Sequence, residues 1–282
     1  MAKTTSPELN FPIEEITERI HLIEQKIGFI IEETKTIQKN LYISTTLEDI
    51  VEKKQLDRAE SKVYEFLKEI ILSNFPDDSI SSEEEIKVVG KNNFTWVLDP
   101  IDGSMNFLRR LPLFVISIGI QHRDTSVAGV VIAPDFGDVY KAILGQGASK
   151  NNESISVSEI HKLDRALLIS AFPSNRKIIL REILADLSAF LTSGRSIRRT
   201  GSIVLDLCWI AEGRIDGLWE KSVGIHDLSA STVILKEAGA IITDYSGSHT
   251  VTYPSEIVVT NGFIHDQVLA VLKKSRTEIS LN

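Results

Sequence analysis

Two aspartates lie three positions apart in the segment FTWVLDPIDGSMNF, at Asp99 and Asp102. The apolar run before Asp99 is typical of a strand, and Pro100 opposes an immediate helix, so we expect both carboxylates at a sheet edge, facing one space. Carboxylates this close repel each other unless a cation or a proton lies between them. Mg²⁺ prefers hard oxygen ligands, so the spacing points to a magnesium site to which the Ile101 carbonyl can contribute.

The residues that follow the two acids suit an anion. If Gly103, Ser104 and Met105 open a helix, their N–H groups face the same space and attract phosphate. Acids that hold a metal beside amides that hold phosphate are typical of a metal-dependent phosphatase. The alternative is that Asp102 only caps a helix and Asp102–Gly103 only makes a turn.

Two amphipathic helices must precede this segment. The first begins at Ile13, and its isoleucine spacing also fits a coiled-coil seam, which Thr34 interrupts, so we favour a packed helix. The second ends before Pro76. Their apolar positions are Ile16, Ile20, Ile23, Ile27 and Ile30, then Leu56, Ala59, Val63, Phe66, Leu67 and Ile70.

The rest of the chain mixes strands and helices, and the IQHRDTSVAG junction reads as a hairpin. We expect an α/β fold, a layered sandwich of alternating helix and sheet layers with mixed, largely antiparallel sheets. The predicted divisions are a flexible tail (1–12), an N-terminal half with most metal ligands (13–160) and a C-terminal half that closes the site (161–282). Strands are expected at 94–99, 113–123, 126–134, 138–145, 165–172, 215–220, 240–244 and 256–260, and helices at 177–191, 201–213, 226–239 and 265–275.

Composition limits the function classes. The formal charge of −8 over 282 residues argues against a general nucleic-acid binder, which needs a basic face. The N-terminus lacks the apolar core of a signal peptide and no apolar run approaches about 20 residues, so we expect a soluble, cytoplasmic protein without membrane contact. The lone Cys208 is expected to be a buried thiol. The histidines without zinc-type spacing are His21, His122, His161, His249 and His265.

Two segments resemble the signatures of the inositol monophosphatase family. WVLDPIDGSMNF is similar to its metal-binding pattern, an apolar residue before D-P-[IL]-D-G-[ST]-x-N-F, and IHDLSASTVILKEAGAIITD is similar to its second signature. The resemblance extends from the helix with LDRAESKV to the last strands. It implies a lithium-sensitive phosphomonoesterase that uses roughly two or three Mg²⁺ ions, with Mn²⁺ as a substitute, and that forms a homodimer.

The resemblance assigns metal ligands to Glu83, Asp99, the Ile101 carbonyl, Asp102 and Asp227. In the SEEEI segment the register leaves Glu84 open as the ligand instead of Glu83, and a solvated acidic loop is the other interpretation. Asp227 opens a helical segment, so its alternative role is that of an N-cap.

For catalysis, the resemblance implies that metal-activated water attacks a phosphomonoester, with Glu83 and Asp99 holding metal. Ser104 would orient this water, and Asp57 would be the acidic partner of the Ser104 hydroxyl. Lys54 stands where the family pattern has Thr, which leaves an exposed helix acid as the other interpretation of Asp57.

Substrate contacts are implied for residues of both halves. Glu220 would accept a hydrogen bond from a substrate hydroxyl, Ile203 is bulkier than the usual Ala, and His226 replaces the usual Trp. These two departures leave the substrate open. The implied substrate-binding residues are Asp102, Gly103, Ser104, Gly201, Ser202, Ile203, Glu220 and Asp227.

Three arginines, Arg195, Arg198 and Arg199, precede the Gly201 segment. They form a solvated loop or subunit contact, or they bind a second phosphate. The expected activity is hydrolysis of a small phosphorylated polyol or sugar, inositol monophosphate first. The alternatives are fructose 1,6-bisphosphate, NADP(H) and, ranked lowest, phosphoadenosine phosphate as substrate, or an inactive phospho-ligand-binding or scaffold protein.

Overall fold

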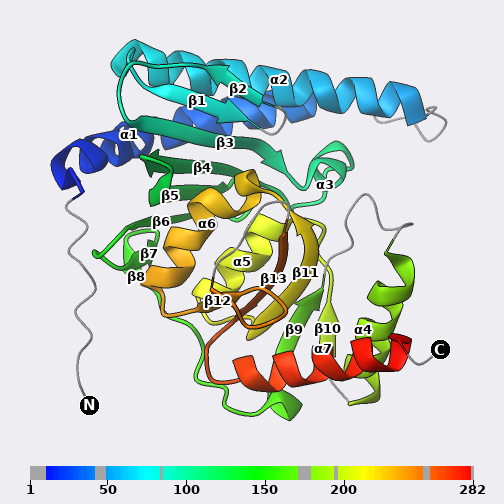
Figure 1. Ribbon diagram of the computed structural model, residues 1–282. Coiled ribbons are helices and arrows are strands. Elements are labelled where there is room, and N and C mark those ends of the chain that lie inside the picture. Colours follow the sequence, from blue (N-terminus) through cyan, green and yellow to red (C-terminus); the bar gives the residue numbers. More distant parts are fainter. Residues whose placement is uncertain are drawn as a thin grey trace.

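The computed structural model describes residues 11–41, 49–82, 85–170, 179–193, 196–249 and 255–280. Five layers alternate between helices and sheets (Figure 1). This arrangement confirms the predicted layered α/β class.

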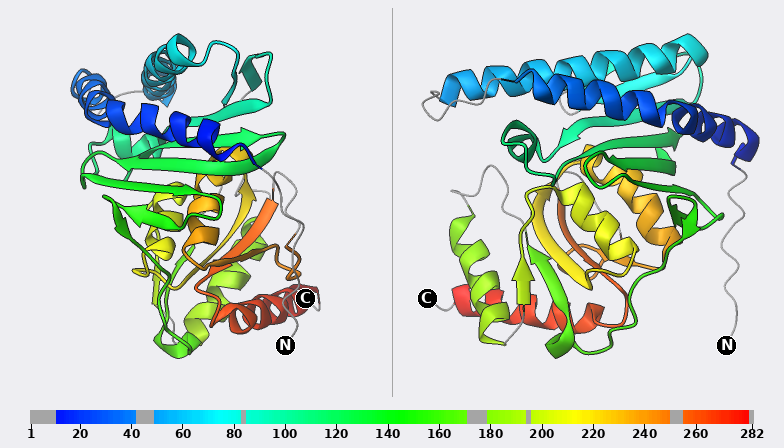
Figure 2. Two further views of the ribbon diagram at one scale, coloured as in Figure 1. Left: turned by 90° about the vertical axis from the view of Figure 1, so that its left-hand side faces the viewer. Right: turned by 180° about the vertical axis from the view of Figure 1, so that it is seen from behind.

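The outer helical layer consists of α1 (Ile13–Lys39) and α2 (Asp49–Asn74), which run side by side over the larger sheet (Figures 1 and 2). Ile16, Ile23 and Ile30 of α1 are fully buried, as the spacing predicts. The helix is therefore packed on the domain rather than free as a coiled coil. None of the described helices has the length and apolar character needed to cross a membrane.

The larger sheet contains eight described strands and is antiparallel except where β1 pairs with β3. Its strands, in order across the sheet, are β2 (Glu85–Val88), β1 (Ser79–Ser82), β3 (Phe94–Asp102), β4 (Val115–His122), β5 (Thr125–Ala133), β6 (Asp138–Ile143), β7 (Ala148–Lys150) and β8 (Glu153–Ser154).

Alternate residues of the larger sheet enter two different cores. Ile116 and Ile118 of β4 face α1 and α2, whereas Val115 of the same strand packs with α5 and α6. A strand turns successive side chains to opposite faces, so a sheet covered on both sides is apolar throughout. The middle layer is formed by α5 (Ile203–Ala211) and α6 (Ile225–Glu237).

The smaller sheet lies against the other side of α5 and α6 and mixes parallel and antiparallel pairs. Its strands, in order, are β10 (Ser196–Arg198), β9 (Leu167–Ser170), β11 (Gly217–Val223), β13 (Ser255–Thr260) and β12 (Ile241–Thr243). Helices α4 (Leu180–Thr192) and α7 (His265–Ser280) cover its outer face.

The larger sheet ends at Ser154 and the smaller sheet begins at Leu167, yet α6, from the later part of the chain, packs on the larger sheet. The division into halves at residue 160 stays a prediction. Of the predicted tail, residues 1–10 lie outside the described residues, whereas the Phe11 ring contacts the His122 ring at 6.2 Å.

Candidate metal centre

Asp99 and Asp102 share a face because β3 is bulged. In a regular strand, residues three apart point to opposite faces. Here Asp99 pairs with Ser117 and Asp102 pairs with Val115, so three steps along β3 match two along β4. The extra residue turns Asp102 back to the side of Asp99. We expected the strand to end at Asp99, but it continues through the bulge to Asp102.

Gly103 follows the bulge and begins the short helix α3 (Ser104–Leu108). Its φ is +89°, and a Cβ here would lie 2.7 Å from the Leu113 carbonyl oxygen. Only glycine accepts both conditions without strain. Ser104 is thereby placed in the first turn of α3, next to the acids.

Asp227 reaches the same place through α6. This helix lies directly on β4 and β5, because Gly119 and Gly129 have no side chains there. A Cβ on Gly129 would be 2.5 Å from the Ala230 carbonyl oxygen, and one on Gly119 would be 2.3 Å from the Ser229 hydroxyl. The first turn of α6 therefore approaches the end of β3.

The three carboxylates meet as a cluster. Ligand oxygens of Asp99, Asp102 and Asp227 all lie within 4.8 Å of one another. Asp99 is buried, and burial raises the pKa of Asp102 to about 6, against a usual value of 3.8. A cluster of hard oxygen donors, whose mutual repulsion a cation would relieve, fits a divalent metal ion of the magnesium type.

Asp102 also caps a helix, but that helix is α5, about a hundred residues away in the chain. Its Oδ2 accepts hydrogen bonds from the Ser202 hydroxyl at 2.5 Å and from the Val204 N–H at 2.8 Å. Asp227 is the third residue of α6 rather than its N-cap, and its Oδ2 accepts the Gly224 N–H at 2.8 Å. Both acids therefore hold a helix start and join the cluster, so capping and metal binding do not exclude each other.

Glu220 lies on β11, next to the middle layer. Its Oε2 has no hydrogen-bond partner among the described residues. Burial raises the pKa of Glu220 well above its usual value, and Asp227, Asp206 and Asp102 raise it further, against the lowering effect of Arg199. A buried acid with an unpartnered oxygen of this kind is suited to meet a ligand hydroxyl.

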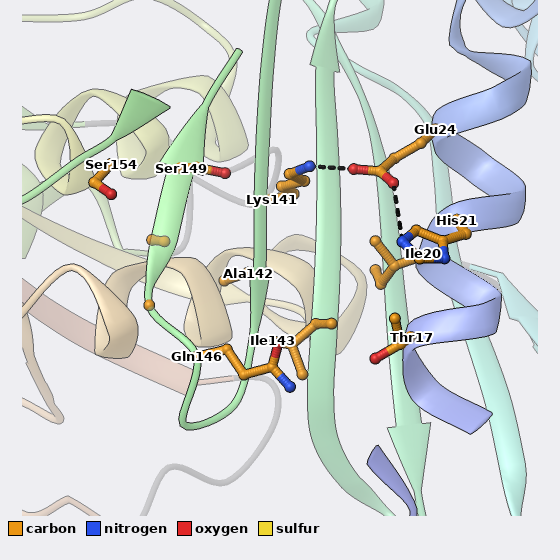
Figure 3. A pocket seen from close by; sticks show the side chains of 12 residues that line it. Thr17, Ile20, His21, Glu24, Lys141, Ala142, Ile143, Gln146, Ser149 and Ser154 are labelled. Carbon is orange, nitrogen blue, oxygen red and sulfur yellow. Dashed lines mark hydrogen bonds and ion pairs between the residues drawn. The ribbon is translucent and has the colours of Figure 1, made fainter. Parts of the chain in front are cut away.

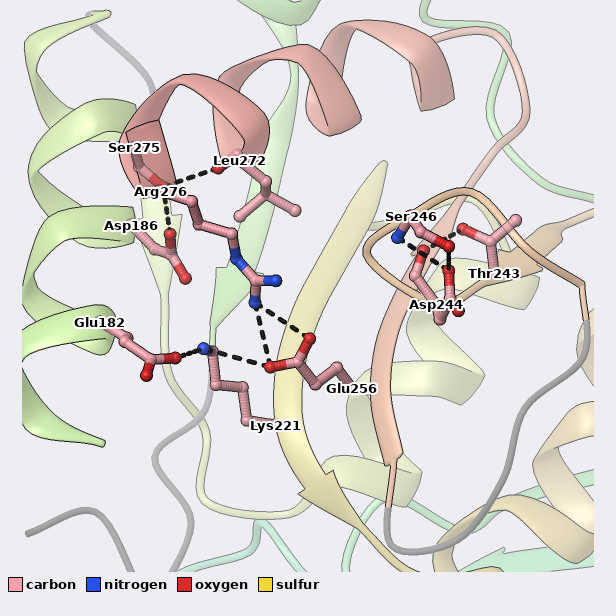
Figure 4. A network of polar contacts seen from close by, with 10 residues as sticks. All are labelled: Glu182, Asp186, Lys221, Thr243, Asp244, Ser246, Glu256, Leu272, Ser275 and Arg276. Atoms are coloured by element: carbon pink, nitrogen blue, oxygen red, sulfur yellow. Dashed lines mark hydrogen bonds and ion pairs between the residues drawn. The ribbon is translucent and has the colours of Figure 1, made fainter. Parts of the chain in front are cut away.

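The neighbour of Glu220 points elsewhere and anchors the strand. Lys221 forms ion pairs with Glu182 of α4 and Glu256 of β13, and Arg276 of α7 binds the same Glu256 at 3.0 Å (Figure 4). Strand alternation thus sends Glu220 toward the middle layer and Lys221 toward the outer helices.

The remaining predicted residues are placed as follows. Asp57 is exposed on α2, and within the described parts of the chain no hydrogen bond joins it to Ser104. The Glu52–Arg109 ion pair at 2.5 Å nevertheless holds α2 against the end of α3. His226 is buried, and its Nε2 lies 3.4 Å from the Ser81 hydroxyl of β1.

The other predicted residues lie within or near segments that the structure does not describe. Glu83, Glu84 and Arg195 fall outside the described residues. Arg198 and Arg199 are exposed, and an added Cβ on Gly201 would lie 3.5 Å from the Arg199 guanidinium. Gly201, with φ of +92°, precedes Ser202, the N-cap of α5, and Ile203, its first residue.

The sequence patterns did not mark Gly119, Gly129 or Asp206 as residues of the site. A glycine inside each of two β-branched strands, ISIGIQH and SVAGVVIA, was a usable signal, because such glycines mark a close backbone approach. Asp206 gave no such signal. It lies in an apolar helix pattern, where a single polar residue has many interpretations.

A cavity of about 270 Å³ lies between α1 and strands β6, β7 and β8, and none of the three clustered aspartates lines it. Its acid, Glu24, is already paired with Lys141 and with His21 (Figure 3). The charges that line this cavity therefore neutralise one another, unlike those of the aspartate cluster.

Comparisons with known proteins agree with this geometry. The model of the inositol monophosphatase family matches residues 13–277. The inositol-1-monophosphatase of Synechocystis sp. is 33% identical over 215 residues, 76% of this chain and 75% of that protein. The Nus factor SuhB of Vibrio cholerae is 35% identical over 192 residues, 68% of this chain and 72% of that protein.

Solved structures share the fold. The inositol monophosphatase of Anabaena sp. superposes with a TM-score of 0.74 at 29% identity, covering 89% of this chain and 96% of that one. The suhB protein of Bartonella henselae gives 0.78 at 24% identity, with 91% and 99% covered. Since the family model spans nearly the whole chain and the aspartates of its signature meet in space, the chain belongs to the inositol monophosphatase family.

Proposed function

We propose that this protein is a Mg²⁺-dependent phosphomonoesterase that hydrolyses a small phosphorylated polyol or sugar, with inositol monophosphate as the first candidate. The observation that carries the proposal is the meeting of Asp99, Asp102 and Asp227 within 4.8 Å from segments far apart in the chain. Family membership supports the reaction class.

The proposed ligands of the metal are these three aspartates, the Ile101 carbonyl and Glu83, with Mn²⁺ as a substitute ion. A bound divalent cation lowers the pKa of water and offsets negative charge on phosphoryl oxygens. Ser104, in the first turn of α3, is proposed to orient the attacking water, with Asp57 as the acceptor for its hydroxyl. The water oxygen would form a bond to phosphorus as the phosphorus–oxygen bond to the alcohol breaks, and the leaving alkoxide would take up the proton that the attacking water releases.

The substrate side is proposed to come from β11 and from the start of α5. Glu220 offers an unpartnered oxygen to a substrate hydroxyl, and residues 201–203 line the polyol. Ile203 is partly buried, and its side chain would leave less space for the substrate than an alanine would. The arginine pair Arg198 and Arg199 is the proposed contact for a second phosphate, if the substrate carries one.

The test is phosphate release in millimolar Mg²⁺ from inositol 1-phosphate, fructose 1,6-bisphosphate, NADP⁺ and phosphoadenosine phosphate. We expect release that EDTA abolishes and that added Mg²⁺ restores, with inositol 1-phosphate turned over fastest. Release unaffected by EDTA, or no release from any of the four, contradicts the proposal.

A second candidate, from another class, is an assembly protein that binds a phosphorylated ligand without hydrolysis. Relatives that carry the name Nus factor motivate it, whereas the cluster of three aspartates favours an enzyme. Binding of inositol 1-phosphate without turnover would support the second candidate. We also propose a homodimer, which sedimentation of the full chain tests.

A further inference from the structure

The segment of residues 200–202 connects β10 to α5 and carries the side chain that holds Asp102. The Ser202 hydroxyl donates to Asp102 Oδ2 at 2.5 Å, and the next contact, from the Val204 N–H, comes from the same helix start. The orientation of the Asp102 carboxylate therefore depends on where this segment lies.

The Thr200 hydroxyl connects the segment to α5. It donates to Asp206 Oδ1 at 2.6 Å and accepts the Ser202 N–H at 3.2 Å. The side chain of Thr200 thus links Asp206 of α5 with the residue that binds Asp102.

Asn106 of α3 fixes the segment from the other side. Its Nδ2 donates to the Thr200 carbonyl at 3.0 Å and to the Leu113 carbonyl at 2.7 Å. The N-terminal part of the chain therefore holds the segment by its backbone, and Asp206 holds it by the Thr200 side chain.

Asp206 has no role in the proposed reaction, yet it is a fully buried acid. Its Oδ2 has no hydrogen-bond partner among the described residues, and burial raises its pKa to about 8. Thr200 and Arg199 partly oppose that rise. A buried acid with an unpartnered oxygen lowers stability. We therefore looked for a role of Asp206 in its contact with residues 200–202.

We propose that Asp206 and Thr200 are positioning residues for the cation site, acting on Asp102 through Ser202. The proposal rests on the proposed function, since it presumes that Asp102 binds a divalent cation. Partners of metal ligands orient those ligands, and their loss typically weakens metal affinity about 10–100-fold.

The test measures binding of Mg²⁺ and of Mn²⁺ alone to the full chain by calorimetry, without substrate. We expect Thr200→Val to raise the Kd about tenfold or more, and Thr200→Ser, which keeps the hydroxyl, to stay within about threefold of the wild type. Asp206→Asn keeps an acceptor for Thr200 and should behave like Thr200→Ser.

A matched control removes a similar bond elsewhere. The Ser158 hydroxyl donates to Asp216 Oδ1 at 2.5 Å, at the start of β11. Ser158→Ala should lower the Tm and leave the Kd unchanged, because Asp216 is not linked to Asp102. If Thr200→Val does not fold, the double variant Thr200→Val/Asp206→Val is measured in its place. It removes the buried acid together with its hydrogen bond, so no carboxylate is left unpaired.

The outcomes separate two failures. If the wild type binds the ions and Thr200→Val binds them equally well while its Tm falls, Thr200 is only structural and the inference is wrong. If the wild type itself binds neither ion, the proposed function fails as well.

Discussion

The outer helical layer and the middle layer differ in whether their buried carboxylates have hydrogen-bond partners for every oxygen. In the outer layer, Arg19 of α1 donates to both oxygens of Asp78 at 2.7 Å, and Trp96 and Asn92 donate to the same carboxylate. At the middle layer, Asp206 of α5 and Glu220 of the adjoining strand β11 each keep a buried oxygen without a partner among the described residues.

This difference separates buried charges that stabilise the fold from buried acids to which we assign a role at the proposed site. A buried polar group without a partner costs free energy, so a fold keeps it where something else completes it. The unpartnered atoms of the outer layer are hydroxyls, those of Thr34 and Tyr64, with no carboxylate among the described residues. The unpartnered carboxylates therefore lie at the middle layer, where we propose the site.

The largest expected effect comes from the cluster itself. Asp99→Asn should lower turnover by more than about 100-fold, because even partners of metal ligands contribute 10–100-fold. The Tm should change little. Phosphate release and circular dichroism measure both. Asp124→Asn, at an exposed turn between β4 and β5, is the control and should retain full activity. Near-normal turnover of Asp99→Asn would refute the metal assignment.

The outer layer should respond in stability and not in cation binding. Arg19→Ala leaves the buried Asp78 without its positive partner, and we expect the free energy of unfolding to fall by about 3–5 kcal/mol. Urea unfolding measures this loss. If the folded variant also lost Mg²⁺ affinity, the two layers would not be separable in the way we describe.

Gly129→Ala tests how the middle layer is held against the larger sheet. The new Cβ would lie 2.5 Å from the Ala230 carbonyl oxygen, so α6 must shift. We expect a loss of about 1–3 kcal/mol together with a higher Kd for Mg²⁺, because Asp227 moves with α6. A stability loss with an unchanged Kd would show that Asp227 tolerates the shift.

The smallest effect, of opposite sign, is expected for a glycine of the outer layer. Gly28 lies exposed in α1, and a Cβ there meets nothing within 4 Å. Gly28→Ala should stabilise the protein by about 0.8–1 kcal/mol, since alanine favours the helix. Thermal unfolding checks this increase, and a lower Tm would contradict the open environment of Gly28.

Much of the fold was predictable from local patterns. The isoleucine spacing of α1, the Ser202 N-cap of α5 and the hairpin between β4 and β5 follow from helix periodicity, capping and turn chemistry. The bulge in β3 was not predictable, because Pro100 marks an irregularity without stating on which side Asp102 emerges. The role of Asp102 at α5 could not be predicted either, since nothing local connects it to Ser202.

By itself, the sequence determined the acidic motif and the periodic patterns that build the layers, because these depend on near neighbours in the chain. Only the tertiary structure decided that Asp227 reaches Asp99, that Asp102 caps α5, and that Asp206 accepts a hydrogen bond from Thr200. The first two of these contacts join residues about a hundred positions or more apart. Asp227 reaches Asp99 because α6 packs directly on Gly119 and Gly129, and such packing is a property of the assembled layers.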